Sequence, residues 1–178
     1  MGIFGFFLLA LAGLICGLVF VASRKPDTFR VERRLSVAAA PEAIFPHIND
    51  LETWQAWSPW ARKDPNAKNT FGAVRAGKGA SMRWEGNKEV GTGTMTITET
   101  VPDSSVTMRL DFEKPFKATN VAQFELRPAG ALTEVIWSLH GPAPLMTKIM
   151  DLLMNMDRMI GRDFEAGLAN LKARVEAH

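Results

Sequence analysis

The chain has 178 residues, with 21 Lys and Arg against 19 Asp and Glu, so its formal net charge is only +2. This near-balance argues against a nucleic-acid-binding protein that works through a broad basic field. One cysteine excludes an intrachain disulfide framework or a cysteine-based zinc site, and three histidines leave little for a histidine-rich centre, so we expect no metal and no cofactor.

The segment 3–22 is uncharged, and its only polar side chain is the thiol of Cys16. Twenty helical residues span about 30 Å, the thickness of the hydrocarbon core of a bilayer. The sequence therefore predicts a transmembrane anchor over residues 1–25. The alternative is a cleaved signal peptide, for which residues 21–23 supply small side chains, but the apolar run is long and no Lys or Arg precedes it.

Charge on the two sides of this span predicts its orientation. No basic residue precedes the span, and five follow it closely: Arg24, Lys25, Arg30, Arg33 and Arg34. The positive-inside rule then places the C-terminal domain, residues 26–178, in the cytoplasm. Within the span, Gly13 and Gly17 form a GxxxG pair, which predicts a weak homodimer seam.

After Pro26, apolar and polar residues alternate from 28 to 38, which predicts a half-buried strand. Arg33 falls on the apolar face of this strand. Its side chain either reaches out to solvent at the strand edge or has a buried role as a ligand partner. A short helix follows from Pro41 to about Asp50, and Pro46 within it predicts a short or kinked element.

A second short helical or turn segment carries Trp54, Trp57 and Trp60. The pattern then has period two, with turn signals between runs, which indicates an antiparallel meander. The expected strands lie at residues 81–85, 90–101, 106–112, 118–128 and 132–141.

From Leu145 to Ala177 the apolar residues recur at helical spacing, which predicts one long amphipathic helix. Gly161 and Gly167 within it predict a close approach to the sheet or a bend. These elements make a two-layer α+β fold. Because one helix cannot cover a curved sheet of six to seven strands, we expect an apolar cavity between helix and sheet.

Several strings, in this order, resemble the helix-grip superfamily of START-like and SRPBCC (polyketide cyclase/dehydrase-like) proteins. They are residues 40–45 (APEAIF), 49–60 (through WSPW), 84–87 (WEGN), 91–95 (GTGTM), 111–116 (DFEKPF) and 160–168 (IGRDFEAGL). The resemblance covers the chain from about Thr28 to its end. It implies an antiparallel sheet wrapped around a long C-terminal helix.

The bacterial membrane-anchored branch of this group is the most similar. That likeness implies a single-pass protein of the bacterial cytoplasmic membrane, whose partners are the membrane, through residues 3–22, and a hydrophobic small molecule or lipid. It implies no particular reaction, because the fold hosts carriers, receptors and enzymes alike.

Large apolar side chains on the strands and short helices are the candidate ligand-binding residues. They are Trp54, Trp57, Trp60, Trp84, Met95, Met108, Phe112, Phe124, Trp137, Met150 and Met154. The alternative is that they fill the core, as a methionine stripe or a set of tryptophans commonly does.

Acid–base candidates are few: Glu85 beside Trp84, Glu99 in line with Met95 and Ile97, and His140 at a strand end. The preferred function is therefore membrane-anchored binding of a hydrophobic small molecule or lipid. The alternatives are a polyketide cyclase/dehydratase-like enzyme that uses one of these three residues, and a non-catalytic interaction module.

Overall fold

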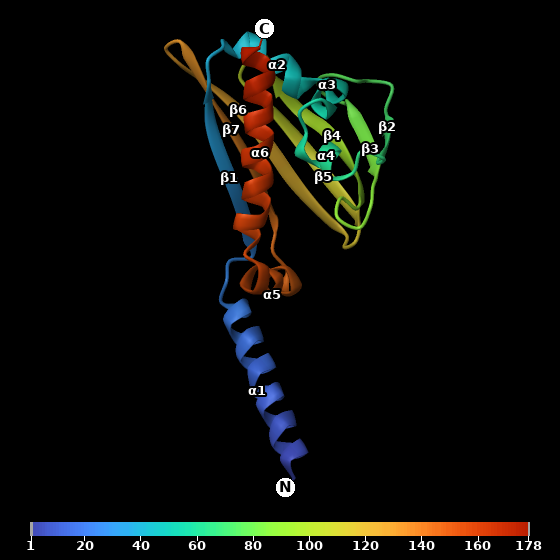
Figure 1. Ribbon diagram of the computed structural model, residues 1–178, viewed down its shortest axis with the longest axis vertical. Helices are drawn as coiled ribbons and strands as arrows, with labels where there is room; N and C mark the ends of the chain where they lie inside the picture. Colours follow the sequence, from blue (N-terminus) through green and yellow to red (C-terminus); the bar gives the residue numbers. More distant parts are fainter. Residues whose placement is uncertain (1, 178) are drawn as a thin grey trace.

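The structure is a computed structural model that describes residues 2–177, so Met1 and His178, the outer limits of the two expected segments, lie outside the described residues. The first helix, α1 (Ile3–Ser23), projects away from the rest of the chain (Figure 1). Of the described helices, it is the one long and apolar enough to cross a membrane, with a mean hydropathy of 2.7 over Phe4–Ser23.

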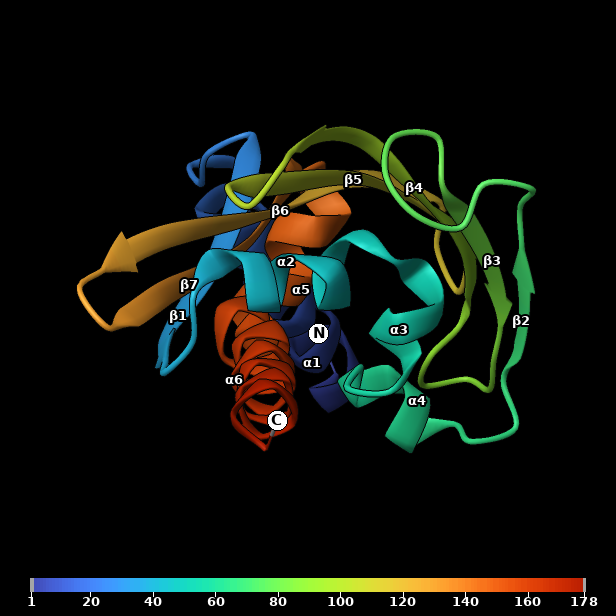
Figure 2. The same ribbon diagram turned by 90° about the horizontal axis from the view of Figure 1, so that it is seen from above.

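The remaining chain forms one seven-stranded antiparallel sheet in the order β1-β7-β6-β5-β4-β3-β2. Its strands are β1 (Thr28–Val37), β2 (Lys68–Phe71), β3 (Ser81–Glu85), β4 (Thr92–Val101), β5 (Ser105–Lys114), β6 (Ala118–Ala129) and β7 (Leu132–Pro142). The sheet is strongly curved (Figure 2). All neighbours pair antiparallel, as the predicted meander requires.

Helices cover the concave side of the sheet. They are α2 (Pro41–Asn49), α3 (Leu51–Gln55), α4 (Pro59–Lys63) and the long α6 (Met156–Glu176), as Figure 2 shows from above. Pro41 occupies the first turn of α2, where its fixed φ and missing N–H cost nothing. Asp50 caps α3 by accepting hydrogen bonds from the backbone N–H groups of Glu52 and Thr53.

The prediction of one long helix over 145–177 is wrong, because the structure has two helices there. Asn155 has a φ of 50°, in the left-handed region, and separates α5 (Leu145–Met154) from α6. Its side-chain oxygen accepts from the N–H of Arg158 and so caps α6. α5 therefore turns across the foot of the domain, next to α1, rather than continuing α6 (Figure 1).

Two glycines let α6 approach the sheet closely, as predicted. A Cβ on Gly167 would lie 2.7 Å from Cζ3 of the Trp137 indole, and a Cβ on Gly161 would overlap the Arg33 guanidinium. The Arg33 side chain is partly exposed, which agrees with the expected position at the strand edge. It joins β1 to α6 through ion pairs with Asp157, at 3.0 Å, and Glu165, at 2.7 Å.

Candidate functional site

An aromatic cluster fills the concave side around α3, α4 and α6. The Trp137 ring stacks on Phe164 with centroids 4.0 Å apart and on Phe124 at 4.7 Å. Trp54 packs against Trp57 at 4.4 Å. The six members, which we call the aromatic cluster, are Trp54, Trp57, Trp60, Phe124, Trp137 and Phe164.

Burial and hydrogen bonds fix this cluster as part of the core. Trp57 and Trp137 are each 1% exposed. The indole N–H of Trp57 donates to the carbonyl of His47 at 2.9 Å, and its own carbonyl accepts from the amide of Asn170 on α6 at 3.0 Å. Met95 and Met108 are buried in the same core, so the five buried rings of the cluster and two thioethers occupy part of the region where a cavity was expected. The indole nitrogen of Trp137 is buried and has no hydrogen-bond partner among the described residues.

The other end of the concave face, from which α1 departs, is less filled; we call it the α1 end. Here Trp84 lies over Gly93, its partner in β4, and its ring meets Phe112 at 5.5 Å in an edge-to-face contact. The Trp84 indole N–H donates to the carbonyl of Val90 at 3.3 Å. Trp84 and Phe112 are only half-buried, as is Trp60, whereas the other five members of the aromatic cluster are buried. These two residues of the predicted ligand wall are therefore partly accessible to solvent.

Asn120 is a polar residue of this end that the sequence analysis did not single out. It is 9% exposed, and it shares the face of Ala122 and Phe124 on β6. Its side-chain oxygen lies against Gly141, where a Cβ would overlap it. Its side chain makes no hydrogen bond with the described residues. The signal was present in the sequence, because an asparagine at an inward position of a strand pattern is a polar group at a buried site.

Two recesses open near the α1 end. One, of about 350 Å³, is lined by Lys63, Met154, Arg158, Met159, Arg162 and Asp163. Lys63 bridges Asp163 of α6, at 2.8 Å, and Glu89 of the β3–β4 loop, at 3.5 Å. Among the described residues, the side chains of Arg158 and Arg162 make no ion pair, so this recess is positively charged and carries two exposed thioethers.

The second recess, of about 210 Å³, lies between α5, β1 and the linker that follows α1. Its cations are already paired. Lys148 donates to Asp27 at 2.6 Å, and Lys25 pairs with Asp151. The hydrogen bond from Lys25 holds the pKa of the Asp151 carboxyl below its ordinary value, so this junction is ionised and internally neutral at pH 7.

Met150 and Met154, the two predicted ligand residues of the C-terminal segment, lie on α5. Met154 is 55% exposed and borders the larger recess, whereas Met150 is half-buried. Both lie apart from the aromatic cluster, because the break at Asn155 turns α5 away from the concave face of the sheet.

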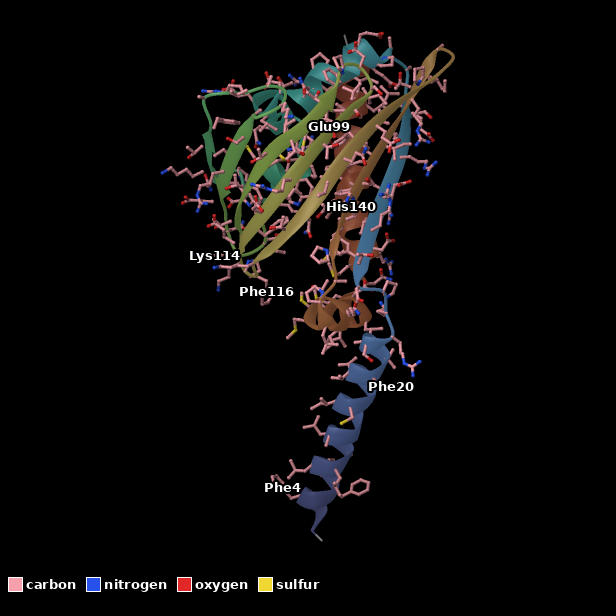
Figure 3. The ribbon with its side chains drawn as sticks, turned by 180° about the vertical axis from the view of Figure 1, so that it is seen from behind. Phe4, Phe20, Glu99, Lys114, Phe116 and His140 are labelled. Carbon is pink, nitrogen blue, oxygen red and sulfur yellow. The ribbon has the colours of Figure 1, made fainter. Side chains whose placement is uncertain are left out.

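The three acid–base candidates point away from the concave face. Glu85 is exposed and pairs with Arg83. A β-bulge between Ile97 and Glu99 reverses the alternation expected for β4, so Glu99 shares the outer face with Thr107 and is exposed. His140 alternates with Leu139 on β7 and lies on the outer face, visible with Glu99 from behind in Figure 3. Among residues 2–177, no group of three His, Cys, Asp or Glu side chains is placed to hold a metal ion.

Comparison with known proteins agrees with this architecture. Residues 28–176 match the model of the family described as polyketide cyclase / dehydrase and lipid transport. The chain belongs to this family. The predicted SRPBCC-type resemblance and the helix-grip fold are thereby confirmed. A search of curated proteins found no match.

Solved structures share the fold of this family member at low sequence identity. Protein CV1439 from Chromobacterium violaceum is 16% identical, covers 85% of this chain and 99% of its own, and has a TM-score of 0.58. The Aha1 dimer from Colwellia psychrerythraea is 17% identical over 83% of this chain and 96% of its own, with a TM-score of 0.57. The di-domain ARO/CYC StfQ of the steffimycin biosynthetic pathway is 13% identical over 84% of this chain and 51% of its own, with a TM-score of 0.62.

Proposed function

We propose that α1 anchors the chain in a membrane and that the domain binds an apolar small molecule or lipid at its α1 end. The observation that carries this proposal is positional. The half-buried pair Trp84 and Phe112 and the recess beside Met154 lie at the end of the domain from which the apolar helix departs. A ligand dissolved in the membrane would meet this end first, and tethering raises its effective concentration there.

The chemistry of the larger recess favours an amphiphile with an anionic end. Lys63, Arg158 and Arg162 surround it with only Asp163 as a facing carboxylate, and Met154 and Met159 give it an apolar wall. Arginine binds carboxylate and phosphate groups through paired hydrogen bonds. The aromatic pair supplies apolar contact area to the rest of such a molecule.

The positive-inside rule supports a cytoplasmic location for the domain. Arg24 and Lys25 directly follow α1, and no basic residue of the chain precedes it. Arg24 packs over the Phe20 ring at 4.8 Å, at the end of the apolar helix, where a cation meets the headgroup region. We propose the bacterial inner membrane as the site of this anchor.

Binding of two fluorescent probes to the full chain in a mild detergent tests the proposal: N-phenyl-1-naphthylamine, which is neutral, and 11-(dansylamino)undecanoic acid, which is anionic. We expect both to bind, and native mass spectrometry of the same sample to show co-purified lipid. The variant Arg158→Gln with Arg162→Gln is expected to weaken binding of the anionic probe about tenfold and of the neutral probe by less than about twofold, since two exposed ion pairs of about 0.7 kcal/mol each amount to about 1.4 kcal/mol.

Arg109→Gln is the matched control, because Arg109 is an exposed arginine paired with Asp111 on the outer face of the sheet. It is expected to leave the affinity for both probes unchanged. The proposal would be contradicted if neither probe bound and no lipid co-purified.

A further inference from the structure

The short helix α5 has its polar and apolar sides reversed relative to a helix packed in a soluble domain. Its polar residues Thr147, Lys148 and Asp151 face the domain, and Lys148 is only 7% exposed. Four of its apolar residues are exposed, with Met146 at 62% and Leu153 at 69%, while Ile149, Met150 and Leu152 are half-buried. A helix in water buries its apolar stripe against the core, so the outward side of α5 is built for surroundings less polar than water.

Specific contacts hold α5 in this reversed orientation. Lys148 donates to Asp27 and Lys25 pairs with Asp151, so two ion pairs join the helix to the linker that follows α1. The Asp151 carboxylate also accepts from the backbone N–H of Met156 at 2.9 Å, at the start of α6. The apolar side is thus turned outward by a polar framework, and a simple rotation of α5 would break that framework.

The β5–β6 turn adds a second apolar group at the same level. Phe116 is 62% exposed, and Figure 3 shows it at about the height of α5 along the long axis of the molecule. Lys114 and Lys117 flank it and are exposed. An exposed aromatic ring between two lysines has the composition of a membrane-interface anchor, in which the ring enters the acyl boundary and the cations meet anionic headgroups.

We infer that α5 and the Phe116 turn lie in the headgroup region of the same bilayer that α1 spans. The inference rests on the anchoring part of the proposed function and adds a second membrane contact to it. α5 runs across the axis of α1 at the point where α1 meets the domain (Figure 1), which is the orientation of an interfacial helix. The outward side chains Leu145, Met146 and Leu153 then leave water, and the larger recess opens next to the acyl chains.

Spin-label accessibility in vesicles of phosphatidylethanolamine and phosphatidylglycerol tests this placement. In a full chain carrying Cys16→Ala, single cysteines replace Met146, Leu153 or Phe116, all of which are exposed, so folding is preserved. Ser104→Cys, in the β4–β5 turn at the opposite end of the domain, is the water-exposed control. A separate sample, the chain with its native Cys16 and no introduced cysteine, reports on α1. Collision rates with oxygen and with a water-soluble nickel chelate give the depth of each label.

We expect labels at 146, 153 and 116 to collide with nickel at least about threefold less often than the label at 104, and the label at 16 to lie deepest. Nickel collision rates at 146 and 153 equal to that at 104, with a deep label at 16, would overturn the docking of α5 while the anchor stands. A nickel-accessible label at 16 would overturn the anchor itself and the inference with it. Spin–spin broadening at 153 that vanishes on dilution with unlabelled chain would show a second copy on this face and would also overturn the inference.

Discussion

Lys148 of α5 donates a 2.6 Å hydrogen bond to Asp27 of the linker, so a lysine that is almost fully buried is neutralised by a carboxylate that is almost fully exposed. The position of α5 beside the end of α1 depends on this pair and on its neighbour, Lys25 with Asp151. The first prediction follows from the titration of these carboxylates.

The hydrogen bond from Lys148 lowers the pKa of Asp27. A lowered pKa stabilises the folded state above the ordinary value of about 3.9, and this contribution is lost as the pH falls through the lowered pKa. Asp27→Asn is therefore expected to lower the melting temperature between pH 5 and 8, and the difference from wild type should shrink below about pH 3.9. Glu99→Gln, an exposed carboxylate without an ion pair among the described residues, is the control; an Asp27→Asn deficit independent of pH would contradict this account.

Gly167→Ala tests the close contact between α6 and β7. In an exposed helix, replacing Gly by Ala stabilises by about 1 kcal/mol. At this site, however, the new methyl group would lie 2.7 Å from the rigid Trp137 indole. We expect overpacking to dominate, with a net loss of about 1–3 kcal/mol in the free energy of unfolding measured by urea denaturation. An increase in stability would show that the helix can move away from the ring at no cost.

Trp84→Ala and Trp57→Ala distinguish the open aromatic pair from the packed cluster. Trp57 is 1% exposed, so its truncation is expected to cost about 3–5 kcal/mol of stability. Trp84 is half-buried at the α1 end, so its truncation should cost less stability and weaken N-phenyl-1-naphthylamine binding about tenfold. Equal probe affinity in Trp84→Ala and wild type would remove Trp84 from the binding site.

Asn155→Gly and Asn155→Ala test the break between α5 and α6. Glycine adopts a φ of 50° without strain, whereas alanine is strained there and also loses the cap on Arg158. We expect Asn155→Gly to differ from wild type by a few tenths of a kcal/mol and Asn155→Ala to lose about 1–2 kcal/mol of stability. If Asn155→Ala raised the helix content measured by circular dichroism with no loss of stability, alanine would have joined the two helices, and this account of the break would be wrong.

Glu85→Gln, Glu99→Gln and His140→Asn are expected to leave probe binding within about twofold of wild type, because all three side chains lie on the outer face of the sheet. Titration with both fluorescent probes measures this. A loss of tenfold or more in any one variant would show that the outer face takes part in binding.

Local sequence patterns were sufficient for most of the fold. The strand over 28–37 and the meander from 81 onward follow from strict alternation, and the family strings placed the long helix on the concave side. β2 (Lys68–Phe71) was missed because it is a four-residue edge strand whose burial depends on β3 alone. Glu99 was assigned to the wrong face because a β-bulge adds one residue without a clear sequence signal.

The candidate site was harder to predict, because the sequence does not say which apolar residues pack on each other. Trp57 and Trp84 are equivalent in a list of tryptophans, yet one is buried in the aromatic cluster and the other borders the open end. The helical period from 145 to 177 was real on both sides of Asn155. The left-handed backbone at Asn155, which the sequence pattern did not reveal, turns α5 so that its exposed apolar side points away from the sheet that α6 covers.

The linker between α1 and β1 is residues 24–27, and ion pairs hold it at both Lys25 and Asp27. A domain on a loose tether sweeps out a hemisphere and meets partners throughout that volume. In the proposed membrane-anchored state, the ion-paired linker instead keeps the domain at one height while it diffuses in two dimensions. Encounters with the proposed ligand would then be lateral, within a thin layer above one leaflet.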